Sequence, residues 1–264
     1  MKQSSLLKRI LTAKRAETHR ARKVASQQTL MERLMGAPPV RPFKESIRRR
    51  QAYQIHLIAE IKKASPLKGV LRAKLDPAAL AKEFEVAGTS ALSVLTDEKF
   101  FQGSVANLNL ARGACSLPVL RKDFVVDTYQ VYESRLMGAD AILLIVRLLA
   151  QQKLKELLTL AKNLSLATIT ETHTAVEVKR AVDAGADMIG VNTRDLDTFK
   201  TRFETAGELR GKIPTGVIAV CESGVESPRQ IETLRDLRYD AVLIGEALMR
   251  ARHPRALIQE LLHG

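Results

Sequence analysis

The sequence predicts an α/β fold: a (β/α)8 TIM barrel preceded by an N-terminal helical extension. Eight short apolar runs recur at intervals of 21 to 34 residues, and each interval leaves room for one helix and two loops. The runs are apolar along most of their length, which is typical of parallel strands buried on both faces. A chain of 264 residues also has the length of one such barrel.

The extension is predicted over residues 1–52 and the barrel over 53–264. Apolar residues recur at helical spacing from Leu6 to about Leu34, with an interruption, and the prolines from Pro38 to Pro42 end this region. A shorter helix is expected from Lys44 to Ala52, leading into the first strand.

The barrel elements are predicted in regular alternation. The expected strands are 56–61, 90–95, 117–120, 140–146, 166–170, 187–191, 216–220 and 240–244. The expected helices are 77–87, 104–112, 127–137, 151–162, 173–184, 203–210, 228–237 and 255–262. A short pattern (GTSAL, GADAI, GADMI, YDAVL) precedes every second strand, as a half-barrel repeat would. An open doubly wound sheet is the alternative, but the glycine-rich phosphate fingerprint that it needs does not follow the first strand.

Most of the net charge of +13 belongs to the extension, because residues 1–52 hold 14 Lys/Arg against 3 Asp/Glu. This segment has no aromatic residue before Phe43, which weakens an interpretation based on stacking with RNA. It also lacks the apolar region of a secretory signal, although its basic start resembles an organellar transit peptide. We instead expect a basic helical extension that packs on the barrel and whose charge faces solvent or attracts an anionic substrate.

Other compositional features point to a cytoplasmic enzyme without a metal. No apolar run approaches the roughly 20 residues of a membrane helix, so no membrane association is expected. The two cysteines, Cys115 and Cys221, and the five histidines lack metal-type spacing.

Charged residues end the first strand. Glu60 and Lys62 fall on the same face of the run that starts at His56, just before a loop with Pro66 and Gly69. This stretch alone fits either a solvated edge strand or a functional site.

The later strands favour the site, because polar residues follow almost every one: Thr96, Asp97, Lys122, Asp123, Arg147, Glu171, Asn192, Arg194, Glu222, Ser223 and Glu246. Barrel enzymes place their chemistry at the carboxyl ends of the strands.

Two features indicate a phosphorylated substrate. Gly224 and Gly245 follow the seventh and eighth strands, where barrels commonly bind phosphate through backbone N–H groups. Lys62, Lys122 and Arg194 are expected on the same rim and suit an anionic molecule.

The strand ends carry motifs that resemble those of the indole-3-glycerol phosphate synthase family. The matching stretches are 60–66 (EIKKASP), 95–104 (LTDEKFFQGS), 118–124 (PVLRKDF), 170–173 (TETH), 191–196 (VNTRDL), 222–225 (ESGV) and 244–249 (IGEALM). The resemblance extends over nearly the whole chain.

The resemblance implies ring closure of 1-(2-carboxyphenylamino)-1-deoxyribulose 5-phosphate, with loss of CO₂ and water and without a cofactor. It implies these catalytic residues: Glu60, Lys62, Lys122, Glu171, Asn192 and Ser223. It implies these substrate-binding residues: Ser65, Phe101, Phe124, Arg194, Gly224, Gly245 and Glu246. Lys122 would be the general acid and Glu171 its partner in dehydration, while the division of steps between Lys62 and Lys122 stays open. The loop from Ser65 to Asp76 would be a lid.

Three residues depart from the family pattern: Leu67, Thr193 and Arg147. Arg147 would either add positive charge to the barrel mouth or point outward into solvent.

Two alternatives are left open, one from the same class of enzyme and one from another class of protein. Phosphoribosylanthranilate isomerase and the tryptophan synthase α-subunit are also phosphate-binding barrels, but the isomerase is expected to carry Cys where this chain has Glu60 and Lys62. An RNA-binding protein acting through residues 1–52 is the alternative from another class. The expected partner is a small phosphorylated substrate rather than nucleic acid or membrane, and the expected assembly is a monomer or homodimer.

Overall fold

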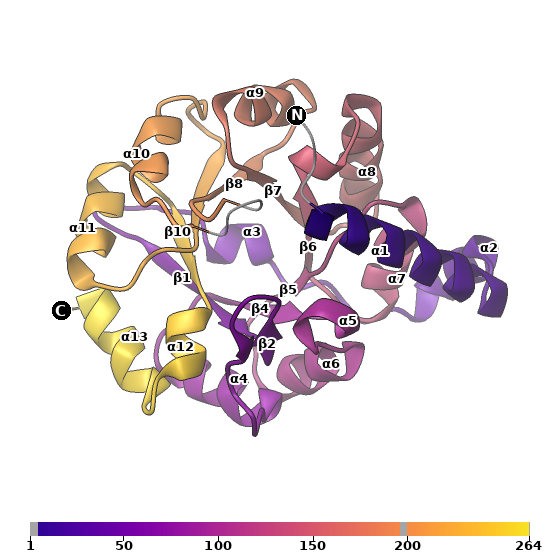
Figure 1. Cartoon of the computed structure of the whole chain (residues 1–264), viewed down its shortest axis with the longest axis horizontal. Helices are drawn as coiled ribbons and strands as arrows, with labels where there is room; N and C mark the ends of the chain where they lie inside the picture. Colours follow the sequence, from indigo (N-terminus) through magenta and orange to yellow (C-terminus); the bar gives the residue numbers. More distant parts are fainter. Residues whose placement is uncertain (1–4, 196–199, 264) are drawn as a thin grey trace.

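The computed structural model describes residues 5–195 and 200–263 and contains a closed barrel of eight parallel strands (Figure 1). The predicted TIM barrel is therefore confirmed. In chain order the barrel strands are β1 (His56–Ile61), β4 (Ala91–Leu95), β5 (Val119–Lys122), β6 (Ala141–Ile145), β7 (Ala167–Thr172), β8 (Met188–Asn192), β9 (Ile218–Glu222) and β10 (Ala241–Ile244). Each pairs with its neighbour in sequence, and β10 closes the ring on β1.

Helices surround the barrel. They are α4 (Pro77–Val86), α6 (Val105–Ala114), α7 (Thr128–Leu136), α8 (Gln151–Asn163), α9 (Ala175–Asp183), α10 (Glu204–Arg210), α11 (Pro228–Asp236) and α13 (Pro254–His263). Their start signals act as expected: the Asp76 carboxylate accepts the Ala79 N–H at 3.0 Å, and Pro77 occupies the first turn. Two short helices that the sequence did not predict, α5 (Glu98–Phe101) and α12 (Glu246–Arg250), follow strand ends.

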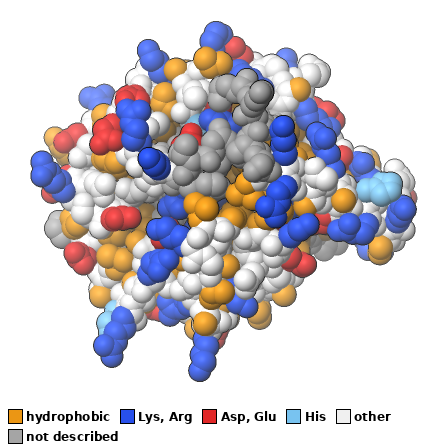
Figure 2. Space-filling model, viewed as in Figure 1, with side chains coloured by type: hydrophobic (Ala, Val, Ile, Leu, Met, Phe, Trp, Pro, Cys, Tyr) orange, Lys and Arg blue, Asp and Glu red, His pale blue; other side chains and the backbone are white. Residues whose placement is uncertain are grey.

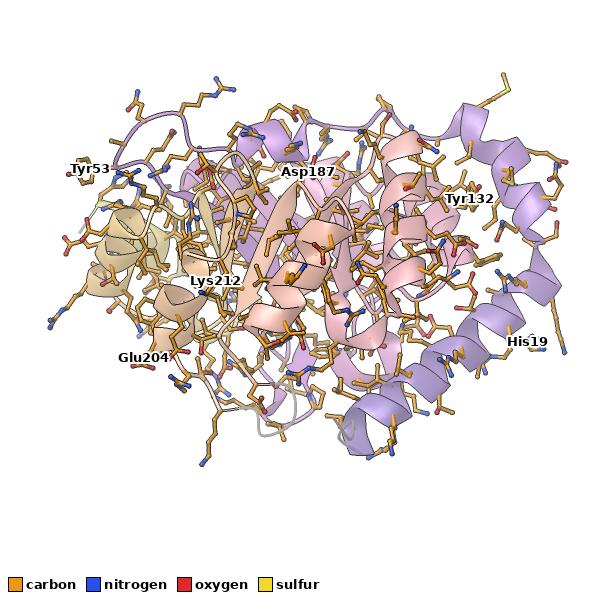
Figure 3. All side chains as sticks on the ribbon, turned by 90° about the horizontal axis from the view of Figure 1, so that it is seen from above. His19, Tyr53, Tyr132, Asp187, Glu204 and Lys212 are labelled. Carbon is orange, nitrogen blue, oxygen red and sulfur yellow. The ribbon has the colours of Figure 1, made fainter. Side chains whose placement is uncertain are left out.

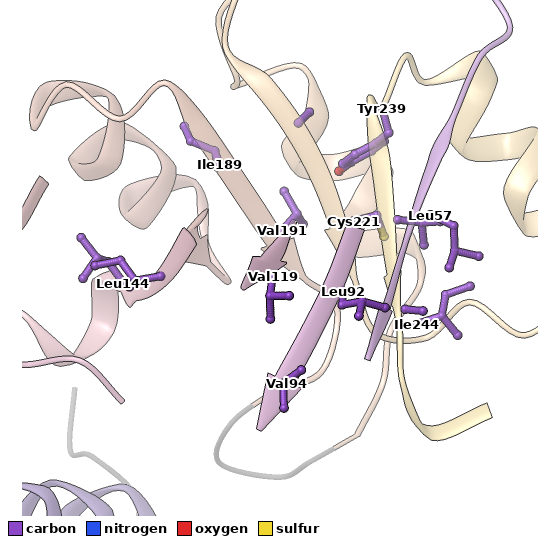
Figure 4. Close-up of a cluster of buried hydrophobic side chains, with 14 of the residues drawn as sticks. Leu57, Leu92, Val94, Val119, Leu144, Ile189, Val191, Cys221, Tyr239 and Ile244 are labelled. Atoms are coloured by element: carbon purple, nitrogen blue, oxygen red, sulfur yellow. The ribbon is translucent and has the colours of Figure 1, made fainter. Parts of the chain in front are cut away.

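The strands are apolar on both faces because both are covered. Ile58, Leu120 and Ile169 point into the barrel and pack on one another. Their neighbours along the strands point outward and pack beneath the helices, as Leu57 and Leu92 do (Figure 4). Two residues beyond Ile58, Leu120 and Ile169, the inward position is polar. This alternation places these inward polar side chains in the carboxyl mouth: Glu60, Lys122, Glu171, Asn192 and Glu222.

The amino end of the barrel is closed by α3 (Phe43–Ser46). Phe43 and the following Ile47 are fully buried against the inward-facing side chains. In the side view of Figure 3, Tyr53 and Asp187 lie at this end, and the long N-terminal helix lies at the opposite end.

The helix expected from Lys44 to Ala52 is wrong beyond the single turn of α3. The chain turns instead along the barrel rim, where the Arg49 N–H donates to the Asp240 carboxylate at 3.1 Å. Asp140 accepts the Arg41 N–H at 2.7 Å in the same manner. The Asp240 carboxylate thus takes the Arg49 N–H, which a longer helix would have paired internally.

The interrupted N-terminal helix forms two helices, α1 (Ser5–Val24) and α2 (Gln27–Arg33), with Ser26 capping the second. Both contact α7 at the side of the barrel (Figure 1). Leu7, Ile10 and Leu11 are buried, whereas most of the basic residues of α1 face solvent (Figure 2).

The loop after β1 forms a small antiparallel hairpin from β2 (Ala64–Ser65) and β3 (Gly69–Val70). The sequence predicted this segment only as an irregular lid. In the part of the chain that is described, no helix has the length and apolarity needed to cross a membrane.

Candidate active site

One cavity opens at the carboxyl end of the barrel, and all the site residues expected from the sequence line it. They are Glu60, Lys62, Ser65, Phe101, Lys122, Phe124, Glu171, Asn192, Arg194, Ser223, Gly224, Gly245 and Glu246. The structure thus brings these residues together, while their individual roles stay predictions.

Lys122 lies at the centre of this cavity. Its Nζ is 2.5 Å from Glu222 Oε2 and 3.4 Å from Glu171 Oε2, so three strand ends converge on one ammonium group. The Glu222 side chain is 1% exposed. Sequence analysis assigned no role to Glu222, although its place two residues after the inward-facing Val220 would have indicated one.

The electrostatics of this cluster favour a charged lysine in the free protein. Burial opposes the ammonium form, but three surrounding carboxylates, with Glu222 the strongest, raise the pKa of Lys122 above its ordinary value. Burial raises the pKa of Glu222 to about 7, and Glu171 adds to this, although the Lys122 ammonium acts in the opposite direction. In the free protein Lys122 is therefore charged, and Glu222 is the carboxyl of this cluster whose pKa burial moves toward neutral pH.

Glu60 and Lys62 form a second pair, with Nζ and Oε1 2.5 Å apart. Burial opposes ionisation of Glu60, but the Lys62 and Lys122 ammonium groups hold the pKa of this carboxyl below its usual value. The ionised form of Glu60 is thus favoured beside Lys62.

Two glycines make room for buried carboxylates. A Cβ on Gly190 would lie 2.0 Å from Glu222 Oε1, and one on Gly245 would lie 2.4 Å from Glu60 Oε1. The sequence assigned Gly245 to phosphate binding alone, and the structure adds this steric reason.

The loop after β9 has an unusual backbone. Ser223 (φ 68°) and Gly224 (φ 75°) both lie in the left-handed region, which is uncommon for a residue with a side chain. Thr193 stabilises the turn by donating its hydroxyl to the Ser223 carbonyl at 2.9 Å. On the neighbouring strand, Gly245 leads directly into the first turn of α12. Short helices after the last barrel strand commonly provide N–H groups for phosphate.

Glu246 joins this region to the hairpin. Its carboxylate is 3.2 Å from Arg194 Nη2 and 2.6 Å from Lys68 Nζ. Partial burial opposes the effect, but Lys68 and Arg194 lower the pKa of Glu246. The hairpin is therefore tied across the cavity mouth.

The aromatic side of the cavity contains Phe101 and Phe124, with ring centroids 6.1 Å apart. Behind them lies Lys14 of α1, 1% exposed and 3.0 Å from Asp97 and 2.8 Å from Asp123. Sequence analysis missed Lys14, because it expected the charge of the extension to face solvent or to attract an anionic substrate. Its helical spacing from Leu7 and Leu11 along the buried stripe was the available signal.

The structure places the residues that depart from the family pattern. Arg147 follows neither predicted orientation: it does not line the cavity, and its Nε lies 3.1 Å from Glu177 Oε1 with the side chain 9% exposed. Leu67 is exposed at the cavity mouth. Across residues 5–195 and 200–263, no group of three His, Cys, Asp or Glu side chains is arranged to hold a metal ion.

The fold and the buried Lys–Glu cluster define a (β/α)8-barrel enzyme with its site at the carboxyl end. A family model described as "Indole-3-glycerol phosphate synthase" matches residues 7–261. Curated proteins of that name are similar to this chain: one from Polaromonas naphthalenivorans is 50% identical over 78% of both chains, and one from Bordetella pertussis is 43% identical over 98% of this chain and 99% of its own. The chain belongs to the indole-3-glycerol phosphate synthase family.

Solved structures with lower identity share the fold. A 3-hexulose-6-phosphate synthase from Salmonella typhimurium aligns with a TM-score of 0.63 at 14% identity, covering 78% of this chain and 96% of its own. A mutant tryptophan synthase α-subunit from Pyrococcus furiosus aligns with a TM-score of 0.57 at 15% identity, covering 78% and 97%.

Proposed function

We propose that this chain converts 1-(2-carboxyphenylamino)-1-deoxyribulose 5-phosphate to indole-3-glycerol phosphate, CO₂ and water, as a carboxy-lyase of tryptophan biosynthesis. The observation that carries the proposal is the buried Lys122 ammonium between Glu171 and Glu222, at the centre of a cavity whose rim suits a phosphate. Membership of the family supports the same reaction.

The cavity offers a complementary place for each part of the substrate. The phosphate would bind the backbone N–H groups around Gly224 and at the start of α12. The aromatic ring would pack against Phe101 and Phe124, and the substrate carboxylate would pair with Lys62. Arg194 and Ser65 complete the rim.

Lys122 is suited to the first chemical step. The ring carbon that bears the carboxylate attacks the ribulose carbonyl, and negative charge develops on the carbonyl oxygen. An ammonium group held in a buried site stabilises that charge and donates a proton to it. Departure of CO₂ then restores the aromaticity of the benzene ring.

Glu171 is suited to the second step. The new hydroxyl must leave as water, which requires one proton, and the ring system must lose its last proton to a base. Glu171 and Lys122 lie within 3.4 Å of each other and supply this base and acid as a pair. Glu222, which exchanges its proton near pH 7, can return the proton to Lys122. Glu60, Asn192 and Ser223 orient these groups.

Indole fluorescence tests the proposal. The wild type should form product from the carboxyphenylamino-deoxyribulose phosphate, and Lys122→Ala and Glu171→Gln should each lose at least about a hundredfold in kcat. Lys179→Ala, at an exposed position on α9, is the matched control and should keep wild-type turnover. Wild-type rates in both site variants would remove the assigned roles.

The cellular setting is also a proposal. A cytoplasmic monomer or homodimer without a cofactor is the expected form. RNA binding through residues 1–52 would instead appear as affinity that falls steeply with salt and disappears when this segment is deleted.

A further inference from the structure

A row of polar side chains continues behind Glu171, away from the cavity. His173 Nε2 lies 3.4 Å from Glu171 Oε1, and His173 Nδ1 lies 3.4 Å from Glu177 Oε2. The other oxygen of Glu177 accepts the Arg147 Nε–H at 3.1 Å. The His173 side chain is only 4% exposed. The row therefore runs from Arg147 to the side of Glu171 that faces away from Lys122.

Local structure holds this row in place. Glu171 precedes His173 by two residues at the end of β7, so their side chains leave the backbone on the same side. Glu177 lies in the first turn of α9, and its carboxylate also accepts the His173 backbone N–H at 2.7 Å. Burial opposes ionisation of Glu177, but His173 and Arg147 hold its pKa below the ordinary value. Glu177 is thus a charged acceptor aimed at the imidazole.

Unsatisfied hydrogen-bonding atoms indicate a contact between His173 and Glu171. Among the described residues, Glu171 Oε1 and both His173 ring nitrogens lack a partner with good hydrogen-bond geometry. A buried acceptor without a donor destabilises the native state. His173 Nε2 and Nδ1 each lie 3.4 Å from a carboxylate oxygen, of Glu171 and Glu177 respectively, so contacts to these carboxylates would satisfy the unpaired atoms.

We propose that His173, oriented by Glu177 and Arg147, is a positioning residue that holds the Glu171 carboxylate in place for the dehydration step. The inference rests on the proposed function of the cavity. The inference also assigns a role to Arg147 that neither of its two predicted orientations included. Arg147 orients Glu177, which orients His173 beside the Glu171 carboxylate.

Kinetics of two variants test the proposal. His173→Leu should lower kcat about tenfold and change KM less than about threefold, because the substrate contacts stay in place. His173→Gln keeps an N–H donor beside Glu171 and should recover kcat to within about threefold of the wild type. His56→Gln is the control, since this partly buried histidine bonds to Ser90 at the amino end of β1, remote from the site. Wild-type kcat in His173→Leu would overturn the proposal.

A double-mutant cycle shows whether His173 acts through Glu171. In the Glu171→Gln background, adding His173→Leu should cost less than about twofold, because the group that His173 positions is already changed. A further tenfold loss would mean that His173 acts independently, and the proposal would be wrong. Thermal melting shows whether a variant is unfolded. If His173→Leu is unfolded, the kcat of His173→Gln and the double-mutant cycle still test the proposal.

A measurement without substrate separates this inference from the proposed function. In ¹⁵N-histidine NMR spectra of the free protein, Glu171→Gln should move the ring-nitrogen signals of His173 and leave those of His56 unchanged. Absence of indole product from the wild type would refute the proposed function alone. Unmoved His173 signals would refute the contact proposed here, whatever the substrate is.

Discussion

The Lys14 ammonium lies 2.8 Å from the Asp123 carboxylate and joins the N-terminal helix to the residue that follows Lys122. Asp123 also accepts the Phe124 N–H at 2.8 Å, and Asp97, the second partner of Lys14, accepts the N–H groups of Phe100 and Phe101. One buried lysine of the extension therefore stabilises both loops that carry the aromatic side of the cavity.

Replacing Lys14 with Met should destabilise the protein by about 3 kcal/mol, because two buried carboxylates lose a counter-charge while the apolar stem is kept. Chemical denaturation measures the change in the free energy of unfolding. Lys8→Met, at an exposed position on the same helix, should change it by less than about 0.5 kcal/mol. KM should rise in Lys14→Met because the aromatic loops shift. Equal stabilities of the two variants would contradict the importance of this buried contact.

Glu222 should make stability depend on pH between about 4.5 and 7. Its pKa is about 7 in the folded state against 4.5 as the ordinary value, so the folded state keeps a proton that the unfolded state has lost. The stabilisation is complete below pH 4.5 and is lost as pH rises through 7. Glu222→Gln removes this dependence.

The wild type should therefore lose stability between pH 4.5 and pH 8, and Glu222→Gln should not. The free energy of unfolding of the variant minus that of the wild type should be larger at pH 8 than at pH 4.5. Denaturation curves at the two pH values measure it. A difference between the two proteins that stays constant with pH would show that Glu222 is ionised throughout. Activity of this variant should fall at every pH, because Lys122 loses its nearest carboxylate.

Gly190→Ala should lower kcat at least about tenfold while the barrel still folds. The added methyl group would lie 2.0 Å from Glu222 Oε1, so the carboxylate must move away from Lys122. Gly113→Ala in α6 is the matched control, since nothing lies within 4 Å of its Cβ position. Steady-state kinetics and circular dichroism check both variants. Unchanged kcat in Gly190→Ala would show that the exact position of Glu222 is unimportant.

Prediction from the sequence was most successful where one periodic signal was enough. The β1 prediction agrees at both ends with the strand that forms, and the other strand predictions lie within about two residues of theirs. It failed where a distant partner decides local structure. The expected helix from Lys44 to Ala52 gives way after one turn because Asp240, nearly two hundred residues later, takes the Arg49 N–H.

The sequence by itself determined the barrel and the set of residues at its mouth. The alternation of strand side chains and the repeated strand–helix unit require inward residues at the strand ends to meet on one rim. Only the tertiary structure decided the partners: Lys122 with Glu222, Lys14 with Asp123, and Arg147 with Glu177. These pairs join segments 30 to 109 residues apart, and no local periodicity specifies which carboxylate a given cation reaches.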